Sequence, residues 1–156
     1  MEYISKNIKD THSIAEEVLN VLISKKDKKA LIVVLKGNLG AGKTEFVKGL
    51  KSFFKIKNNI LSPTFVLMKV YDILNKKIGF KKLYHFDLYR MLDKKSKQKD
   101  LEDALSCLDI YDVLNNPDNI VLIEWGEAVK MLNKFKKYVV SFESCNGNMR
   151  KISIDF

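Results

Sequence analysis

Residues 37–44 have the types and the spacing of a loop that binds phosphate groups. They read Gly-Asn-Leu-Gly-Ala-Gly-Lys-Thr, which fits the pattern G-x-x-x-x-G-K-[ST]. In such a loop, backbone N–H groups turn toward phosphate oxygens, the lysine reaches the β- and γ-phosphates, and the final hydroxyl ligates Mg²⁺. We therefore predict that the chain binds a nucleotide together with Mg²⁺. The predicted phosphate site consists of Gly37, Asn38, Leu39, Gly40, Ala41, Gly42, Lys43 and Thr44.

The segments on either side of this loop are the ones that the motif requires. An unbroken apolar run, 30–35, precedes the loop, as is typical of a central parallel strand. A helical stretch, 43–53, follows it. This order predicts an α/β fold of three layers, similar to that of P-loop NTPases. The central sheet would be mainly parallel, with the nucleotide at the carboxyl edge of the strands.

A second strand ends in a carboxylate that is suited to bind the metal. The apolar run 120–123 leads directly into Glu124. At the carboxyl edge of a parallel sheet, Glu124 would point into the same crevice as Lys43 and Thr44. Because Mg²⁺ in such sites is held by the loop hydroxyl and one acid at a strand end, we predict Thr44 and Glu124 as metal ligands. The next residue, Trp125, is either part of the core or a lid over the nucleotide pocket.

Hydrolysis would also need a group that positions the attacking water, and Asp87 is the candidate. It follows a predicted strand in the sequence His-Phe-Asp-Leu-Tyr-Arg, 85–90. Asp87 would orient or deprotonate water, or it would pair with Arg90 as a structural bridge. Its spacing leaves both interpretations open. His85 is interpreted as a semi-buried structural histidine rather than a catalyst.

Two threonines are further candidates, each with a structural alternative. Thr64 follows a Ser-Pro pair, 62–63, and is either a switch-type residue that senses the γ-phosphate or part of an ordinary turn. Thr11 lies just before a predicted helix and either caps it or contacts the nucleotide base. That helix is predicted to start at Ser13, which has the capping-box spacing to Glu16. The N-K-x-D signature by which a GTPase reads guanine is missing from the sequence, so ATP is the favoured nucleotide.

The rest of the chain alternates between short strand and helix patterns. Residues 93–99 are polar and lysine-rich and are predicted to be mobile. No repeat or linker divides the chain, which is predicted to be one P-loop ATPase domain over residues 1–156. The other predicted strands are 3–8, 65–71, 78–86, 119–123, 137–143 and 151–156, the last two joined by a turn with Asn146-Gly147, and short helices are predicted within 101–116 and at 128–132.

Composition and charge exclude several classes of protein. The chain has 156 residues, 46% of them hydrophobic, which is typical of a globular protein. It has no apolar signal core and no apolar run of membrane-spanning length, so we expect a soluble, cytoplasmic protein without a membrane partner. Cys107 and Cys145 are too few for a disulfide framework or a zinc cluster and are expected to be reduced, buried thiols.

The net charge of +9 favours the binding of an acidic partner. Only Arg90 and Arg150 among the 28 basic residues are arginines, which are the residues best suited to read phosphates and bases directly. The lysines are therefore interpreted as solvated faces of loops and helices. Direct contact with RNA is the less favoured alternative.

Four motifs together make the sequence similar to the TsaE (YjeE) family of small bacterial P-loop ATPases. They are residues 39–44, Ser-Pro-Thr-Phe at 62–65, His-Phe-Asp-Leu-Tyr-Arg at 85–90 and Ile-Glu-Trp at 123–125, and the resemblance runs almost end to end. It implies Mg²⁺-dependent ATP hydrolysis that supports the TsaD–TsaB complex in the threonylcarbamoyl modification of adenosine-37 in tRNA. Any contact with tRNA would then be indirect, through that complex.

The resemblance also implies roles for individual residues. The catalytic residues that it implies are Asp87 in hydrolysis, Lys43 on the phosphates and Thr64 in a switch-like segment. It places Mg²⁺ on Thr44 and Glu124. Outside the phosphate loop, the residues that it places near the nucleotide are Thr11 at the base, Trp125 along the site and Arg150.

The sequence departs from the family pattern at three positions. Asn38 stands where the family usually has aspartate, Glu45 where it has threonine, and Gly126 where it has proline. The first two positions vary within the phosphate-loop motif, so the prediction of nucleotide binding stands. Glu45 brings negative charge close to the phosphates. Gly126 is expected to loosen the turn after Trp125.

Two alternatives to a partner-coupled ATPase remain at the level of sequence. One is a nucleotide-dependent module that binds tRNA or protein and hydrolyses ATP incidentally. The other is a small-molecule kinase, which the scarcity of arginines disfavours. Because no arginine is evidently poised as a finger, the chain alone is expected to hydrolyse ATP slowly.

Overall fold

The apolar run before the phosphate loop forms the middle strand of a seven-stranded sheet. The computed structural model describes residues 1–92, 98–145, 147 and 149–155. The strand order is β1-β7-β6-β2-β5-β4-β3. The strands are β1 (Glu2–Ser5), β2 (Leu31–Gly37), β3 (Met68–Asp72), β4 (Lys82–Asp87), β5 (Asn119–Glu124), β6 (Tyr138–Ser144) and β7 (Arg150–Asp155).

The centre of this sheet is parallel and its flanks are antiparallel. Strands β6, β2, β5 and β4 run in the same direction, whereas β7 and β3 run opposite to their neighbours and β1 pairs antiparallel with β7. The predicted α/β class with a mainly parallel centre is therefore confirmed. The carboxyl ends of the four parallel strands meet at one edge, where such folds bind ligands.

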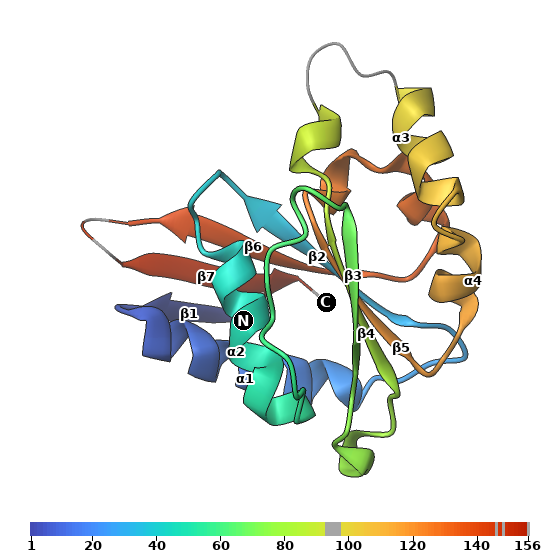
Figure 1. Cartoon of the computed structure of the whole chain (residues 1–156). Coiled ribbons are helices and arrows are strands. Elements are labelled where there is room, and N and C mark those ends of the chain that lie inside the picture. The colour runs from blue at the N-terminus through green and yellow to red at the C-terminus, as the bar shows by residue number, and fades with distance from the viewer. Residues whose placement is uncertain (93–97, 146, 148, 156) are drawn as a thin grey trace.

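Helices cover both faces of the sheet, which gives the three predicted layers (Figure 1). On one face lie α1 and α2, and on the other lie α3 and α4. The α-helices are α1 (Ile8–Ile23), α2 (Lys43–Phe54), α3 (Gln98–Ser106) and α4 (Ile110–Asn115), and the 3-10 helices are η1 (Lys76–Ile78), η2 (Tyr89–Leu92), η3 (Gly126–Ala128) and η4 (Lys130–Lys134).

Strand β2 shows why its sequence is apolar without alternation. Leu31, Val33 and Leu35 pack on the side of α1 and α2, whereas Ile32 and Val34 pack on the side of α3 and α4. All five side chains are buried. Burying one such aliphatic side chain contributes about 1.5–3 kcal/mol, so both faces of this strand hold the layers together.

The start of the chain differs from the prediction. Strand β1 ends at Ser5, and α1 begins at Ile8 rather than near Ser13. The cap is Asn7, whose side chain accepts a hydrogen bond from the Asp10 N–H at 3.0 Å, while the Asp10 carboxylate accepts one from the Lys6 N–H at 2.8 Å. The first of these bonds satisfies an N–H group that the first turn leaves unpaired, and the second fixes the chain just before the cap, so the helix starts about one and a half turns earlier than predicted.

Two other strand boundaries move for reasons of turn geometry. The strand predicted from Phe65 starts only at Met68, because the Val66 N–H bonds to the Pro63 carbonyl at 2.9 Å and Leu67 has a left-handed backbone, with φ of 63°. The strand predicted from residue 78 starts at Lys82, after η1 and a left-handed glycine. The helix predicted at 128–132 is replaced by η3 and η4.

Three smaller expectations also have an outcome. Both cysteines, Cys107 and Cys145, are exposed, so the expectation of buried thiols is wrong. Residues 93–97 of the segment predicted to be mobile, and Asn146 of the predicted hairpin turn, lie outside the described residues. Within the part of the chain that the structure describes, no helix has the length and apolar character needed to cross a membrane.

The close approach of α1 and α2 yields a testable prediction at Gly49. A Cβ atom added there would lie 2.6 Å from Cα of His12, so an alanine must push the two helices apart. We expect Gly49→Ala to lower the free energy of unfolding by about 1–3 kcal/mol, in spite of alanine's better helix propensity. Denaturant unfolding measures this, with Ser52→Ala on the exposed side of α2 as the control. A Gly49→Ala variant more stable than wild type would contradict the close packing.

Candidate nucleotide-binding site

The register of the parallel strands brings the predicted acidic residues together. Glu124, the last residue of β5, is paired with Leu35 of β2 on one side and with Asp87 of β4 on the other. The phosphate loop follows β2 directly. A cavity of about 410 Å³ lies at this edge, lined by loop residues 39–45 and by Thr64, Asp87, Tyr89, Glu124 and Trp125.

Two glycines of the loop are required by its geometry. At Gly37, a Cβ atom would lie 2.6 Å from the carbonyl oxygen of Phe142 in β6, so only glycine lets the loop leave the sheet there. Gly42 precedes α2 with φ of 103°, in the region that side chains disfavour. This is the backbone that the motif predicts, ending at a helix N-terminus that can face a phosphate.

Lys43 is held in place by the loop itself. Its ammonium group donates to the carbonyl oxygens of Gly37 at 2.6 Å and Asn38 at 2.9 Å, and it lies 4.1 Å from the centroid of the Trp125 ring. Burial lowers the pKa of Lys43, and the negative charges of Glu124, Glu127 and Asp87 counter part of that effect. The amine is thus a partly desolvated cation whose present partners are neutral, which suits it to meet an anionic phosphate.

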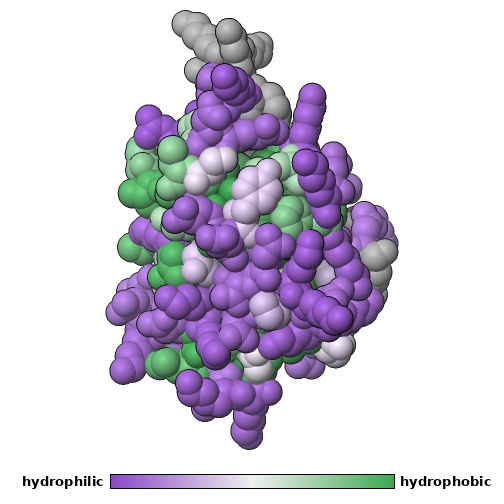
Figure 2. Space-filling view, turned by 90° about the vertical axis from the view of Figure 1, so that its right-hand side faces the viewer, coloured by the Kyte–Doolittle hydropathy of each residue, from purple (hydrophilic) through white to green (hydrophobic). Residues whose placement is uncertain are grey.

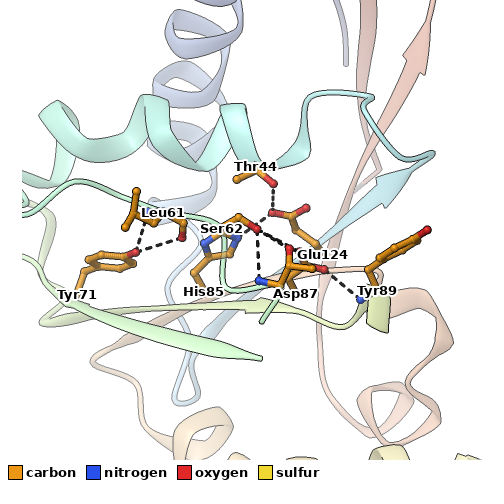
Figure 3. Close-up of polar contacts among 9 residues, drawn as sticks. Thr44, Leu61, Ser62, Tyr71, His85, Asp87, Tyr89 and Glu124 are labelled. Atoms are coloured by element: carbon orange, nitrogen blue, oxygen red, sulfur yellow. Dashed lines mark hydrogen bonds and ion pairs between the residues drawn. The ribbon is translucent and has the colours of Figure 1, made fainter. Parts of the chain in front are cut away.

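Thr44 and Glu124 are in direct contact, as the predicted metal site requires. The Thr44 hydroxyl donates to Oε1 of Glu124 at 2.7 Å, as Figure 3 shows. Because the hydroxyl proton points at the carboxylate, the lone pairs of Thr44 remain available as metal ligands. Glu124 is buried, with only 3% of its surface exposed. A buried carboxylate needs such partners, since an isolated charge there is costly.

His85 is a site residue whose role the sequence analysis missed. It is completely buried, and its Nε2 lies 2.9 Å from the same Oε1 of Glu124 (Figure 3). Among the described residues, no hydrogen-bond partner lies near its Nδ1. A neutral ring with the proton on Nε2 fits this arrangement, because it donates to Glu124 and leaves no N–H unpaired. The signal was present in the two-residue spacing to Asp87, which puts both side chains on one face of β4.

Asp87 forms hydrogen bonds with the segment that contains Thr64. Its Oδ2 accepts from the Thr64 hydroxyl in a short hydrogen bond and lies 3.4 Å from the Ser62 hydroxyl, while its Oδ1 accepts from the Tyr89 N–H at 3.0 Å. Arg90, the alternative partner predicted for Asp87, lies over the Phe65 ring. Its guanidinium carbon is 5.1 Å from the ring centroid. The structure thus brings Asp87 and Thr64 together beside the phosphate loop.

Trp125 adopts an unusual backbone at the edge of the cavity. Its φ of 65° is left-handed, which is uncommon for a bulky residue and is found mostly where function imposes it. The ring packs against Tyr89 at 5.3 Å between centroids. The next residue, Gly126, is tightly packed, because a Cβ there would lie 2.9 Å from Cγ2 of Ile123. The expectation that Gly126 loosens this turn is therefore not what the packing shows.

A second cavity of about 680 Å³ continues from the phosphate loop and shares Gly40, Gly42 and Glu45 with the first. Thr11 and Arg150 both line it. Thr11 is buried inside α1, and its hydroxyl lies 2.7 Å from that of Ser5. The cavity adjoins the phosphate loop, and the predicted contacts of Thr11 and Arg150 with a nucleotide stay predictions.

Glu45, the departure that brings negative charge to this region, has two hydrogen-bonding neighbours, of which Lys48 is a cation. His12 lies 2.9 Å from one carboxylate oxygen and Lys48 lies 3.1 Å from the other. Burial raises the pKa of Glu45, but the hydrogen bonds from His12 and Lys48 outweigh it, so that this pKa lies below its ordinary value. The neighbours also offset the charge, so Glu45 repels a bound phosphate less than its position suggests.

The oxygen ligands present fit Mg²⁺ bound together with a nucleotide. The Thr44 hydroxyl and the Glu124 carboxylate are hard oxygen ligands, which Mg²⁺ prefers. Within the described ranges, no group of three or more His, Cys, Asp or Glu side chains is placed to hold a metal by itself. Mg²⁺ commonly completes its shell with substrate phosphates and water, as this pair of ligands would require.

The sheet order, the glycine loop and the strand-end acids define this chain as an α/β protein of the P-loop NTPase-like class. It belongs to the TsaE family, because the family model described as "Threonylcarbamoyl adenosine biosynthesis protein TsaE" matches residues 5–152.

Two relatives named tRNA threonylcarbamoyladenosine biosynthesis protein TsaE match most of the chain. The one from Haemophilus influenzae is 35% identical over 81% of this chain and 73% of its own length. The one from Aquifex aeolicus is 32% identical over 98% of this chain and 94% of its own length. The crystal structure of Bacillus subtilus YdiB superposes on this chain with a TM-score of 0.63 and is 24% identical in sequence. The match covers 99% of this chain and 83% of the YdiB chain, and it supports the fold.

The contact between His85 and Glu124 gives a prediction that separates positioning from packing. His85→Leu keeps the volume but removes the donor to a buried carboxylate, so we expect a loss of about 1–3 kcal/mol in the free energy of unfolding. We also expect a higher Mg²⁺ concentration for half-maximal nucleotide binding. His85→Gln is the matched control, because its amide N–H can take the place of Nε2. Equal Mg²⁺ requirements in the two variants would show that His85 only fills space.

Proposed function

We propose that this protein is a Mg²⁺-dependent ATPase of tRNA threonylcarbamoyladenosine biosynthesis. The observation that carries the proposal is that Lys43, Thr44, Glu124, Asp87 and Thr64 line one cavity beside a loop of phosphate-binding type. The names of the relatives support the pathway. Soluble, cytoplasmic action fits that pathway.

Each residue has a chemical task in this proposal. Lys43 and the N–H groups of the loop bind the β- and γ-phosphates. Thr44 and Glu124 hold Mg²⁺, which neutralises charge that develops on the phosphate oxygens. Asp87 orients the attacking water or accepts its proton. Because Asp87 also binds the Thr64 hydroxyl, the position of the 58–67 segment and the action of Asp87 are linked.

The second cavity would take the rest of the nucleotide. Thr11 and Arg150 line it together with Gly40 and Gly42 of the phosphate loop. In this proposal they contact the base or ribose, and Trp125 borders the phosphates through its contact with Lys43. ATP is favoured over GTP because the guanine-reading signature is missing from the sequence.

We further propose that hydrolysis is slow until the TsaD–TsaB complex binds. Arg90 lies over Phe65, and Arg150 lies in the second cavity, so neither arginine contacts the acids beside the phosphate loop. A charge supplied by a partner can raise the rate of phosphoryl transfer by several orders of magnitude. The segment around Thr64 exposes Leu61, Phe65 and Val66, which gives a partner apolar surface next to the site.

A nucleotide-dependent binding module with incidental hydrolysis is the second candidate. It is favoured by the hydrogen bonds from the Thr64 hydroxyl and the Tyr89 N–H, which occupy both carboxylate oxygens of Asp87. The two candidates differ in whether turnover depends on Asp87. A small-molecule kinase is disfavoured, because such enzymes use several arginines and this chain has two.

Nucleotide binding can be followed through Trp125, which is the only tryptophan in the sequence. Its ring lies 4.1 Å from the Lys43 ammonium, which would turn toward phosphates when a nucleotide binds. We expect Mg²⁺·ATP to change the tryptophan fluorescence, and Lys43→Ala to abolish or strongly weaken this response. Trp125→Phe tests that the signal comes from this ring. An undiminished response in Lys43→Ala would place the nucleotide elsewhere.

The ATPase itself is tested by steady-state turnover with and without the TsaD–TsaB complex. We expect the complex to stimulate wild type, and we expect Asp87→Asn and Glu124→Gln each to lower the stimulated rate about 100-fold or more, as is typical for loss of a group that acts in the transition state. Asp87→Asn should still bind ATP, as read from Trp125. Stimulated turnover that survives Asp87→Asn would favour the binding module.

A further inference from the structure

The positive charge of this protein is concentrated at the edge of the sheet opposite the nucleotide site. The parallel strands β6, β2, β5 and β4 all begin there, so the segments that lead into them lie at the same edge. Together with Lys82, the first residue of β4, these segments contain eleven lysines and two aspartates, a net charge of +9 that equals the charge of the whole chain. We call these lysines the basic edge; they are Lys25, Lys26, Lys28, Lys29, Lys76, Lys77, Lys81, Lys82, Lys134, Lys136 and Lys137.

The rest of the molecule is balanced, which argues against a uniform lysine bias. All residues outside these four segments and Lys82 sum to zero charge. Other charged residues that reach the same edge do not alter its balance. Lys55 and Lys57 follow the end of α2, and they are matched by Asp72 and Asp155 at the ends of β3 and β7. The excess is therefore a property of this edge.

Contacts between the segments make the basic edge a continuous surface. Lys29 from the segment before β2 lies over Phe135 from the segment before β6, 4.8 Å from the ring centroid. Lys25 and Lys136, one from each of these segments, both lie 5.8 Å from the centroid of the Tyr138 ring.

A similar set of contacts joins the segments before β2, β4 and β5. Asp118 accepts from Lys81 at 2.7 Å and lies 3.9 Å from Lys26. Lys26 also donates to the carbonyl oxygen of Gly79. Three stretches of chain that are distant in sequence thus present their lysines side by side, and the fourth, before β5, contributes Asp118.

The surface is hydrophilic and exposed. Ten of the eleven lysines are exposed, and Lys137 is partly buried. Figure 2 looks onto the side of the molecule where α3, α4 and these segments lie, and hydrophilic side chains dominate its centre and lower part. The pocket between the segments before β2 and β6 has a volume of only about 40 Å³, too small for a small-molecule ligand. A partner would therefore bind across the surface.

We propose that the basic edge binds the phosphate backbone of a structured RNA. Lysine is a flexible point charge that binds phosphates without reading sequence. Neighbouring strands are about 4.8 Å apart, so the starts of four strands span about 15 Å, which matches a run of several phosphates. Phe135 and Tyr138 are buried beneath the lysines, so bases find no aromatic surface to stack on. The proposed contact is therefore with the phosphate backbone of the RNA.

An acidic protein surface fits these observations less well. Stable protein interfaces have an apolar centre that is depleted of charge. In the four segments of the basic edge, Leu74 is the one exposed large hydrophobic side chain among the described residues, with 39% of its surface exposed, and a single such residue does not form an apolar centre. The exposed apolar residues Leu61, Phe65 and Val66 lie instead in the 58–67 segment, which adjoins the nucleotide site.

This inference rests on the proposed function, in which a tRNA is the substrate of the pathway, and it adds a direct contact to it. Because the basic edge and the nucleotide site lie at opposite ends of the same strands, RNA and ATP can be bound together. The scarcity of arginines in the sequence favours solvated lysine faces over RNA contact, whereas the distribution of charge in the fold favours RNA contact.

The test is the salt dependence of tRNA binding by the chain without partner proteins or nucleotide. The variant Lys28→Gln/Lys76→Gln/Lys134→Gln takes one exposed lysine from each of three segments. If each of them neutralises a phosphate, the slope of log affinity against log salt should become shallower by about 1 per lysine, or about 3 in total. The matched control, Lys36→Gln/Lys69→Gln/Lys99→Gln, removes the same charge elsewhere and should leave the slope nearly unchanged.

Three outcomes would overturn the proposal. They are no measurable tRNA binding by wild type, equal loss in the two triple variants, and unchanged tRNA binding in the edge variant with weakened binding of poly-L-glutamate. The last would identify an acidic protein as the partner. Nucleotide binding by each triple variant, read from Trp125, and its stimulated ATPase activity are measured in parallel. Failure of RNA binding with an intact ATPase therefore leaves the proposed function standing.

Discussion

The structure depends on the in-phase register of three parallel strands. Leu35 of β2, Glu124 of β5 and Asp87 of β4 lie level with one another at the carboxyl edge. Because side chains alternate along a strand, a shift of β5 by one residue would turn Glu124 to the opposite face of the sheet. Thr44 and His85 would then lose their shared acceptor, and the buried polar groups of the site would be left without partners.

That register also explains why so many polar groups can be buried at this edge. Lys43, His85, Asp87 and Glu124 all have less than 5% of their surface exposed. Each would be costly alone, but hydrogen bonds with groups from α2, β4 and the 58–67 segment offset the loss of water. Lys43 of the phosphate loop is held by two carbonyl oxygens, and the side chains of Ser62 and Thr64 contact one carboxylate, that of Asp87.

The sequence was most informative where a single physical requirement fixes both residue type and position. The apolar run of β2, the glycines of the loop and the acids at strand ends could be predicted because the fold admits few alternatives there. The start of α1 could not, since Asn7 and Ser13 both offer a cap and only the packing of the helix against the sheet decides between them. His85 was missed because a histidine on a buried strand has many structural uses, and its partner is 39 residues away. Gly126 was misjudged because its crowding comes from Ile123 and Val34, which no local pattern reveals.

The contact between Gly49 and His12 has a consequence for how this sequence can change over time. The two positions are on different helices, and the absence of a side chain at one leaves room for the backbone of the other. Thr11 of the second cavity and Glu45 beside the phosphate loop lie on these same two helices. Because every residue at position 12 has a Cα, no substitution there would make room for a side chain at position 49, so glycine is expected to persist at position 49 among homologous sequences whatever residue occupies position 12.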